Sequence, residues 1–168
     1  MLTIVKEGYD DYRRYRLDKI ENAGFATVLG REDKYTGKLQ PVNKWTKLNP
    51  FLTHSTAEPY PVPEEEFNGL RWVPVRWSEI KVGDVIRLCR DEPIPADLVL
   101  LHSDGENKLA YIETMALDGE TNLKSKQVTP ALEGCDTIEG ISKCKADFVV
   151  ENPNPDLYNF DGRVTVSE

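Results

Sequence analysis

Two acidic residues flank a glycine in the tetrapeptide Asp118-Gly119-Glu120-Thr121, which closely follows a predicted strand. Glycine has no Cβ, so this loop can bring its backbone and both carboxylates close to another molecule. A carboxylate such as that of Glu120 can orient and polarise water, and the Thr121 hydroxyl can donate a hydrogen bond. By itself the tetrapeptide favours an ordinary solvated turn, because Asp-Gly is a frequent turn pair and acidic residues on loops are usually solvated.

Two further motifs precede this tetrapeptide. Residues 81–85 read Lys-Val-Gly-Asp-Val, residues 92–100 read Glu-Pro-Ile-Pro-Ala-Asp-Leu-Val-Leu, and residues 117–124 read Leu-Asp-Gly-Glu-Thr-Asn-Leu-Lys. In this order they resemble the actuator domain of P-type ATPases, in which the first two motifs are strands and the third is the dephosphorylation loop. Cation pumps usually carry Thr-Gly-Glu-Ser there, whereas Asp-Gly-Glu-Thr-Asn-Leu-Lys is similar to the type IV branch, the phospholipid flippases. Residues 7–14 and 152–162 also resemble that branch, next to its second and third membrane spans.

The resemblance implies one catalytic residue, Glu120, whose carboxylate directs hydrolysis of an aspartyl-phosphate formed on another domain. Three neighbours complete the predicted phosphate-approach loop. Gly119 would leave room for the phosphate, Thr121 would donate a hydrogen bond, and Asp118 would shape the turn through its side chain.

The resemblance also implies parts of a pump that this sequence lacks. The sequence has no phosphorylation motif, no recognisable ATP site and no apolar run near the ~20 residues of a membrane-spanning helix. We therefore expect an inactive fragment that holds no cofactor or metal. Phosphorylation, nucleotide-binding and membrane domains of the same polypeptide would bind Mg2+ and ATP and move a phospholipid, together with a transmembrane accessory subunit. The chain would be a cytosolic domain of an integral membrane protein in the Golgi, endosomal or plasma membrane.

Two alternatives stay open at this point. The first is the actuator domain of a cation-transporting P-type ATPase, which would use the same glutamate. The second is a non-catalytic β-domain that binds a partner, or Ca2+, through Asp118, Glu120 and Glu113. Calcium takes about 6–8 oxygen ligands, so these three acids would need more distant residues to complete a site.

Charge is distributed unevenly along the 168 residues. Residues 1–50 hold ten Lys and Arg against seven Asp and Glu, whereas residues 51–168 hold eleven against twenty-two. Nucleic acid is excluded as a partner, because no basic stripe displaces phosphate counterions. The basic cluster at residues 12–16 and Lys19 could lie against acidic lipid headgroups or form the solvated face of a helix. The interrupting Asp10, Asp11 and Asp18 favour the solvated face.

Cysteine and histidine usage indicates no metal site. The three cysteines, Cys89, Cys135 and Cys144, are irregularly spaced and too few for a disulfide framework, which indicates a reducing cytosol. Neither histidine has a Cys or His at ligand spacing.

The pattern of apolar and turn residues predicts a mainly β fold. A helix is expected at residues 9–23, ended by Gly24, and a proline-rich loop or insertion at about 34–70. Strands are expected at 25–29, 72–77, 84–88, 97–101, 109–113, 148–150 and 163–166. A short helix near 139–145 would start at Thr129 or Thr137.

Short, regularly spaced strands favour a sandwich, jelly roll or barrel. The second motif has a structural interpretation, with Pro95 stiffening the entry to a strand and Asp97 capping it. The family resemblance narrows the fold to a distorted jelly-roll-like actuator domain with a flanking N-terminal helix and a short C-terminal helix. We expect a helical connector at 1–24 and the actuator domain at 25–168.

Overall fold

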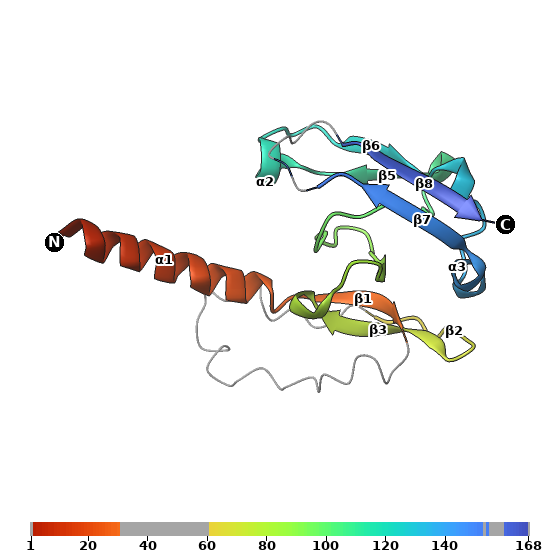
Figure 1. The fold of residues 1–168 in the computed structure, drawn as a ribbon, viewed down its shortest axis with the longest axis horizontal. Helices are drawn as coiled ribbons and strands as arrows, with labels where there is room; N and C mark the ends of the chain where they lie inside the picture. Colours follow the sequence, from red (N-terminus) through yellow and green to blue (C-terminus); the bar gives the residue numbers. More distant parts are fainter. Residues whose placement is uncertain (1, 31–60, 153, 155–159, 168) are drawn as a thin grey trace. The chain divides into compact units, whose positions relative to one another are not determined.

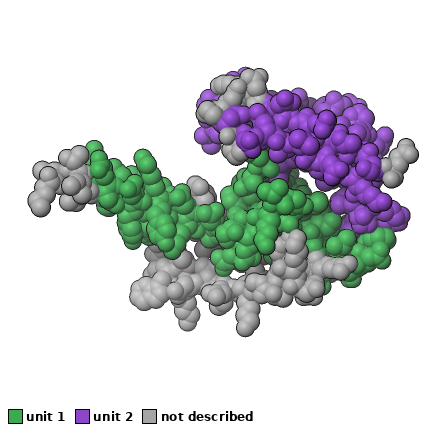
Figure 2. Space-filling view, in the orientation of Figure 1, with its two compact units in different colours: residues 1–97 green, residues 98–168 purple. Residues whose placement is uncertain are grey.

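The structure is a computed structural model that describes residues 2–30, 61–152, 154 and 160–167 (Figure 1). The chain forms two compact units, residues 1–97 and residues 98–168, which Figure 2 colours separately. Most of the predicted loop or insertion at 34–70 lies outside the described residues, which resume at residue 61. The predicted division into a connector at 1–24 and an actuator domain at 25–168 stays a prediction.

The first unit begins with the helix α1, Leu2–Glu21. The predicted helix at 9–23 is confirmed, with an earlier start and an end shortly before Gly24. Side chains from residue 6 to residue 19 are all exposed. No helix in the described part of the chain combines the length and the apolar character needed to cross a membrane.

An antiparallel sheet follows α1, with the strand order β2-β3-β1-β4. Its elements are β1 (Phe25–Gly30), β2 (Glu66–Phe67), β3 (Leu70–Arg76), the short 3-10 helix η4 (Trp77–Glu79) and β4 (Val85–Arg87). On the central strand, Val28 is the register partner of Val73 in β3 and of Ile86 in β4. Val28, Val73 and Val75 form a buried cluster, against which Ile80 and Ile86 pack. This valine cluster is the core of the sheet, as expected for β-branched residues on a pleated surface.

Left-handed backbone shapes two turns of this unit. Asn68 and Gly69 join β2 to β3 with φ of 52° and 76°, which is the geometry of a type I′ hairpin. Gly83 has a φ of 91°, and beside it the carboxylate of Asp84 accepts a hydrogen bond from the Lys81 amide at 2.8 Å. The Val-Gly-Asp motif is therefore a turn that leads into β4.

The second unit contains two antiparallel hairpins. β5 (Leu109–Ile112) pairs with β6 (Lys124–Gln127), and β7 (Lys145–Val150) pairs with β8 (Gly162–Ser167). Its helical elements are the 3-10 helices η5 (Glu106–Lys108) and η6 (Pro130–Leu132), and the α-helices α2 (Met115–Asp118) and α3 (Ile138–Lys143). Thr137 caps α3 by accepting a hydrogen bond from the Gly140 amide at 3.1 Å, so the predicted start at Thr137 is confirmed. Among its described residues, Val128, Leu132, Cys135 and Ile138 are buried.

The mainly β fold, with its N-terminal helix and short C-terminal helix, is confirmed, whereas the jelly-roll order of the strands stays a prediction. The predicted strand at 97–101 is wrong, because these residues join no strand of the described part of the chain. Leu98 and Val99 are 43% and 40% exposed. An aliphatic run becomes a strand only where a neighbouring strand offers hydrogen bonds and a surface to pack on. The boundary between the two units falls here, after Asp97.

Candidate functional site

The candidate site lies in the loop that connects the two strands of the β5–β6 hairpin. β5 ends at Ile112, β6 begins at Lys124, and these two residues are register partners. Their pairing holds the two ends of the loop together. Residues 118–121, which we call the acidic loop, are therefore carried between two paired strands within the second unit.

A single helical turn positions the acidic loop. The short helix α2 ends at Asp118, and Gly119 follows in the left-handed conformation with φ 76° and ψ 2°. Its amide donates to the carbonyl of Met115 at 3.0 Å, which closes the turn. A Cβ on Gly119 would meet no atom within 4 Å. Within this chain the glycine is therefore required by its backbone conformation, and the space beside it is open for an approaching group.

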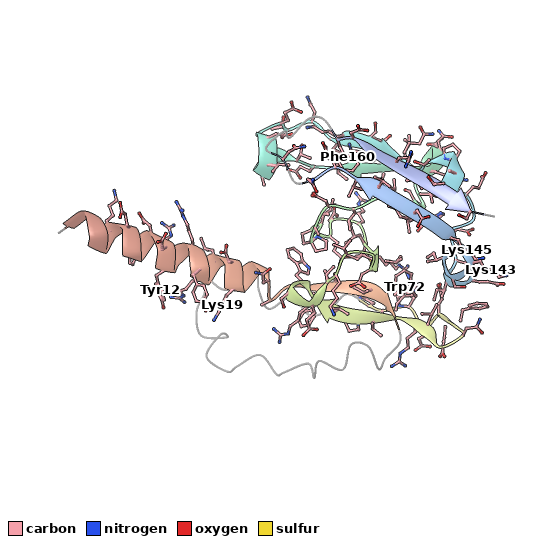
Figure 3. The ribbon with its side chains drawn as sticks, viewed as in Figure 1. Tyr12, Lys19, Trp72, Lys143, Lys145 and Phe160 are labelled. Carbon is pink, nitrogen blue, oxygen red and sulfur yellow. The ribbon has the colours of Figure 1, made fainter. Side chains whose placement is uncertain are left out.

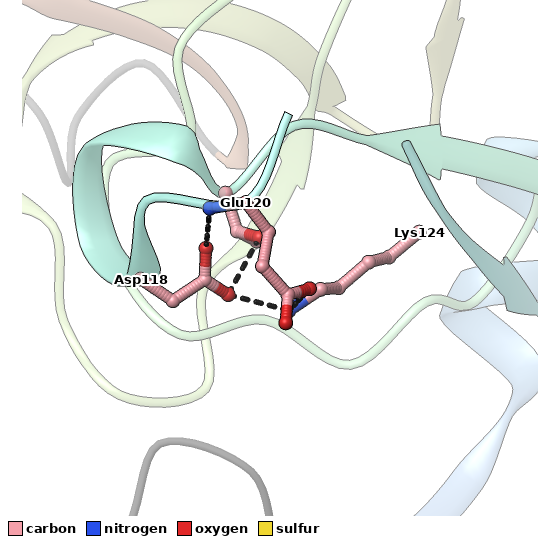
Figure 4. Close-up of polar contacts among 4 residues, drawn as sticks. Asp118, Glu120 and Lys124 are labelled. Carbon is pink, nitrogen blue, oxygen red and sulfur yellow. Dashed lines mark hydrogen bonds and ion pairs between the residues drawn. The ribbon is translucent and has the colours of Figure 1, made fainter. Parts of the chain in front are cut away.

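The Asp118 side chain holds this turn together (Figure 4). Its Oδ1 accepts a hydrogen bond from the Glu120 amide at 2.9 Å. Its Oδ2 accepts from the Thr114 hydroxyl at 2.9 Å and from the Lys124 ammonium at 2.5 Å. The side chain is only 3% exposed. Asp118 thus links the start of α2, the acidic loop and the first residue of β6.

Glu120 points its carboxylate toward the same ammonium. Its Oε2 lies 3.1 Å from Lys124 Nζ, and its side chain is 50% exposed, against 31% for that of Lys124 (Figure 4). One lysine therefore joins a buried carboxylate to a half-exposed one. The buried member fixes the loop, and the exposed member is free to meet a group outside the chain.

The ionisation of Asp118 and Lys124 follows from these contacts. The hydrogen bond from Lys124, with those from the Glu120 amide and the Thr114 hydroxyl, lowers the pKa of Asp118 to about 2. The pKa of Lys124 is raised, because its ammonium donates to Asp118 and to Glu120. Both residues are therefore charged at neutral pH.

The other candidate residues are divided between the two units, with Thr121 and Glu113 in the second. Thr121 and Glu113 are exposed, and Pro95 and Asp97 of the second motif lie in the first unit. Lys124, which contacts both carboxylates, was given no role in the sequence analysis. The sequence shows only that Lys124 stands four residues after Glu120, and its pairing with Ile112 is known from the structure.

A divalent cation would compete with the Lys124 ammonium for the carboxylates at this site. A calcium ion shared by Asp118 and Glu120 would have to displace the Lys124 ammonium, which contacts both carboxylates. Within residues 2–30, 61–152, 154 and 160–167, no group of three or more His, Cys, Asp or Glu side chains is placed to hold a metal ion. The site therefore resembles a carboxylate pair that a single ammonium partly neutralises more than a cation-binding loop.

Comparisons with known proteins identify relatives of the whole chain, although no protein-family model matches it. The chain is 36% identical over 97% of its length to the probable phospholipid-transporting ATPase DNF3 of Saccharomyces cerevisiae. It is 39% identical over 70% of its length to the phospholipid-transporting ATPase DRS2 of the same yeast. It is also 32% identical over 96% of its length to the phospholipid-transporting ATPase VD of Homo sapiens.

The chain is a relative of the type IV P-type ATPases. The resemblance that the three sequence motifs carry is thereby confirmed. The chain spans about a tenth of the length of these curated relatives, namely 11%, 8% and 9% of the three phospholipid-transporting ATPases named above. The chain therefore matches one segment of each of these relatives.

Proposed function

We propose that the chain is the actuator domain of a phospholipid-transporting ATPase, in which Glu120 orients the water that hydrolyses an aspartyl-phosphate on another domain. The observation that carries this proposal is the contrast between two neighbouring carboxylates. Asp118 is buried and accepts three hydrogen bonds, whereas Glu120 is half exposed on the turn that Asp118 fixes. A general base that acts on a separate domain must be both accessible and held in place by its neighbours.

The surroundings of Glu120 suit an approach to phosphate. A carboxylate that nears a phosphoryl group meets charge of its own sign, which costs free energy. The Lys124 ammonium, 3.1 Å from the Glu120 carboxylate, offsets this repulsion. The open space beside Gly119 admits phosphoryl oxygens, and the exposed Thr121 hydroxyl donates a hydrogen bond to one of them.

The reaction needs partners outside this chain. In the proposed pump, the phosphorylation and nucleotide-binding domains of the same polypeptide supply the aspartyl-phosphate and bind ATP and Mg2+. A membrane domain and a transmembrane accessory subunit carry the phospholipid, and this chain stands on the cytosolic side. The acidic loop then acts only when the domains dock, so that domain movement controls the timing of hydrolysis.

The test is the Glu120→Gln variant of the intact pump. Glutamine keeps the shape of the side chain but cannot serve as the base, so phosphorylation from ATP should continue while the phosphoenzyme accumulates. The matched control is Glu113→Gln, which makes the same change at an exposed position in the same inter-strand loop. Phosphoenzyme that decays at the wild-type rate in the Glu120→Gln pump would remove this glutamate from the mechanism.

Two other functions remain distinguishable by experiment. The actuator of a cation pump would use the same glutamate, but phosphoenzyme decay would then respond to a metal ion and not to added phospholipid. A calcium-binding β-domain would give a saturable signal when the chain is titrated with Ca2+ in a calorimeter. The names of the relatives favour the phospholipid pump over the cation pump. The Lys124 ammonium disfavours calcium binding, because it already contacts both carboxylates.

A further inference from the structure

The helix α1 separates its charges around its axis, although they nearly cancel in sum. Between residues 6 and 19 it carries five basic and four acidic residues. Because an α-helix turns by about 100° per residue, the acidic residues fall within one arc of about 100° and four basic residues fall on the opposite side. The acidic set is Glu7, Asp10, Asp11 and Asp18, and the basic set is Lys6, Arg13, Arg16 and Lys19.

Two tyrosines share the arc of the basic set. Tyr9 and Tyr12 are 66% and 57% exposed, and the Arg16 guanidinium lies 6.0 Å from the centroid of the Tyr12 ring. Figure 3 shows Tyr12 and Lys19 extending from the same side of α1. We call the four basic residues and these two tyrosines the basic face of α1. The fifth basic residue, Arg14, projects among the acidic set.

The chemistry of the basic face fits a phospholipid surface. Tyrosine has an apolar ring and a polar hydroxyl, so it is favoured at the headgroup level of a bilayer. Lysine and arginine extend long apolar stems and place their charge among phosphates. A helix face that packs on a protein core would carry aliphatic residues at these positions instead of exposed charges.

The acidic residues of α1 would be repelled by an anionic surface, but this repulsion weakens with distance. The Debye length at physiological ionic strength is about 8 Å, and a helix with its side chains is about 10–12 Å across. When the basic face rests on an anionic surface, Glu7, Asp11 and Asp18 lie roughly a helix diameter away, and their repulsion is screened. The aspartates that interrupt the basic cluster along the sequence therefore lie on the acidic side of the helix, with Asp10 at its border as the i,i+4 neighbour of Lys6 and the i,i+3 neighbour of Arg13.

We infer that α1 binds the surface of an anionic phospholipid bilayer through its basic face and lies in the interface with its acidic side toward water. Charge complementarity selects an anionic partner, and the tyrosines placed among the basic residues select a bilayer over an acidic protein. This binding is independent of the role proposed for Glu120, because it depends on no residue of the acidic loop.

The test is sedimentation of the full chain of residues 1–168 with vesicles of phosphatidylcholine, with and without phosphatidylserine. The chain should bind the vesicles that contain phosphatidylserine, and added salt should release it. Arg13→Gln should weaken binding about fivefold, since a basic residue near an anionic surface contributes by that factor. Arg14→Gln is the matched control, because it removes the same charge from the adjacent residue on the acidic side and should leave binding unchanged.

Four outcomes would overturn the inference. The chain could bind both kinds of vesicle equally or bind neither, or the Arg13→Gln and Arg14→Gln variants could lose binding to the same extent. The chain could also elute as a dimer that Arg13→Gln dissociates while no vesicle is bound, which would assign the basic face to a second copy. Far-UV circular dichroism of each variant checks that α1 is retained, and the salt dependence of the unaltered chain tests the inference without any substitution.

Discussion

The ammonium of Lys124 lies 2.5 Å from Oδ2 of Asp118, whose side chain is 3% exposed. The pair ties the first residue of β6 to the last residue of α2, across the acidic loop. The same ammonium contacts the Glu120 carboxylate at 3.1 Å, so Lys124 couples the fixed part of the loop to its exposed acid. Removing one partner from such a pair leaves the other without its counter-charge.

Lys124→Gln should therefore slow dephosphorylation in the intact pump. Without the ammonium, the Glu120 carboxylate loses its fixed position and meets the full repulsion of the phosphoryl group, and we expect decay of the phosphoenzyme to slow about tenfold or more. A chase of radiolabelled phosphoenzyme with unlabelled ATP measures this rate. Lys126→Gln, at an exposed position on the same strand, is the matched control and should decay as the wild type does. Equal decay in both variants would contradict a positioning role for Lys124.

Asp118 should titrate well below an ordinary aspartate in the isolated chain. Its hydrogen bonds lower its pKa from 3.8 to about 2, with the bond from Lys124 contributing most. Because the folded pKa lies below the unfolded one, ionised Asp118 stabilises the fold, fully above the ordinary pKa and progressively less as the pH falls toward the folded value. The pH dependence of its carboxyl carbon shift measures the midpoint by NMR. The midpoint should rise in Lys124→Gln and stay unchanged in Lys126→Gln, and a midpoint unaffected by Lys124→Gln would assign the shift to other contacts.

Local patterns in the sequence predicted most of the elements. Alternating β-branched and aromatic residues gave β1, β3, β5 and β8 close to their bounds, and a threonine followed by a polar helical segment predicted the cap of α3. Each of these elements is predicted by a sequence pattern that spans only a few residues. The strand β2, which lies within the loop predicted at about 34–70, was missed, as were the short helix α2 and the strand β6. A two-residue strand, a single helical turn and a four-residue polar strand carry almost no periodicity.

The site was predicted in composition but not in arrangement. The sequence singled out Asp118 and Glu120 as neighbours with different roles, and the structure adds the reason they differ in exposure. That reason is Lys124, which reaches both carboxylates only because β5 and β6 pair at Ile112 and Lys124. A contact that depends on strand register cannot be inferred from the acidic loop alone. The wrong strand at 97–101 has the same cause, since an apolar run in the sequence does not show whether a neighbouring strand is available to pair with it.

Val28→Ala should destabilise the first unit. Val28 is 0% exposed at the centre of the valine cluster, and removing two methyl groups there costs about 2 kcal/mol through lost burial and the cavity left behind. Denaturation by urea, followed by circular dichroism, measures the change in the free energy of unfolding. Val82→Ala makes the same change at a fully exposed turn residue and should shift the midpoint little. Similar losses in the two variants would mean that the sheet does not rely on this cluster.

Gly119→Ala and Gly8→Ala should have opposite effects, although a Cβ meets no atom within 4 Å at either glycine. Gly119 has a φ of 76°, so alanine there is strained by about 1 kcal/mol, whereas Gly8 lies within α1, where alanine is favoured by about 0.5–1 kcal/mol. Thermal unfolding followed by circular dichroism should show a loss of stability for Gly119→Ala and added helical signal for Gly8→Ala. In the intact pump, only Gly119→Ala should also slow decay of the phosphoenzyme, because it displaces the Glu120 carboxylate from its bond to Lys124. A stable Gly119→Ala chain with wild-type decay would show that the left-handed turn does not position the acid.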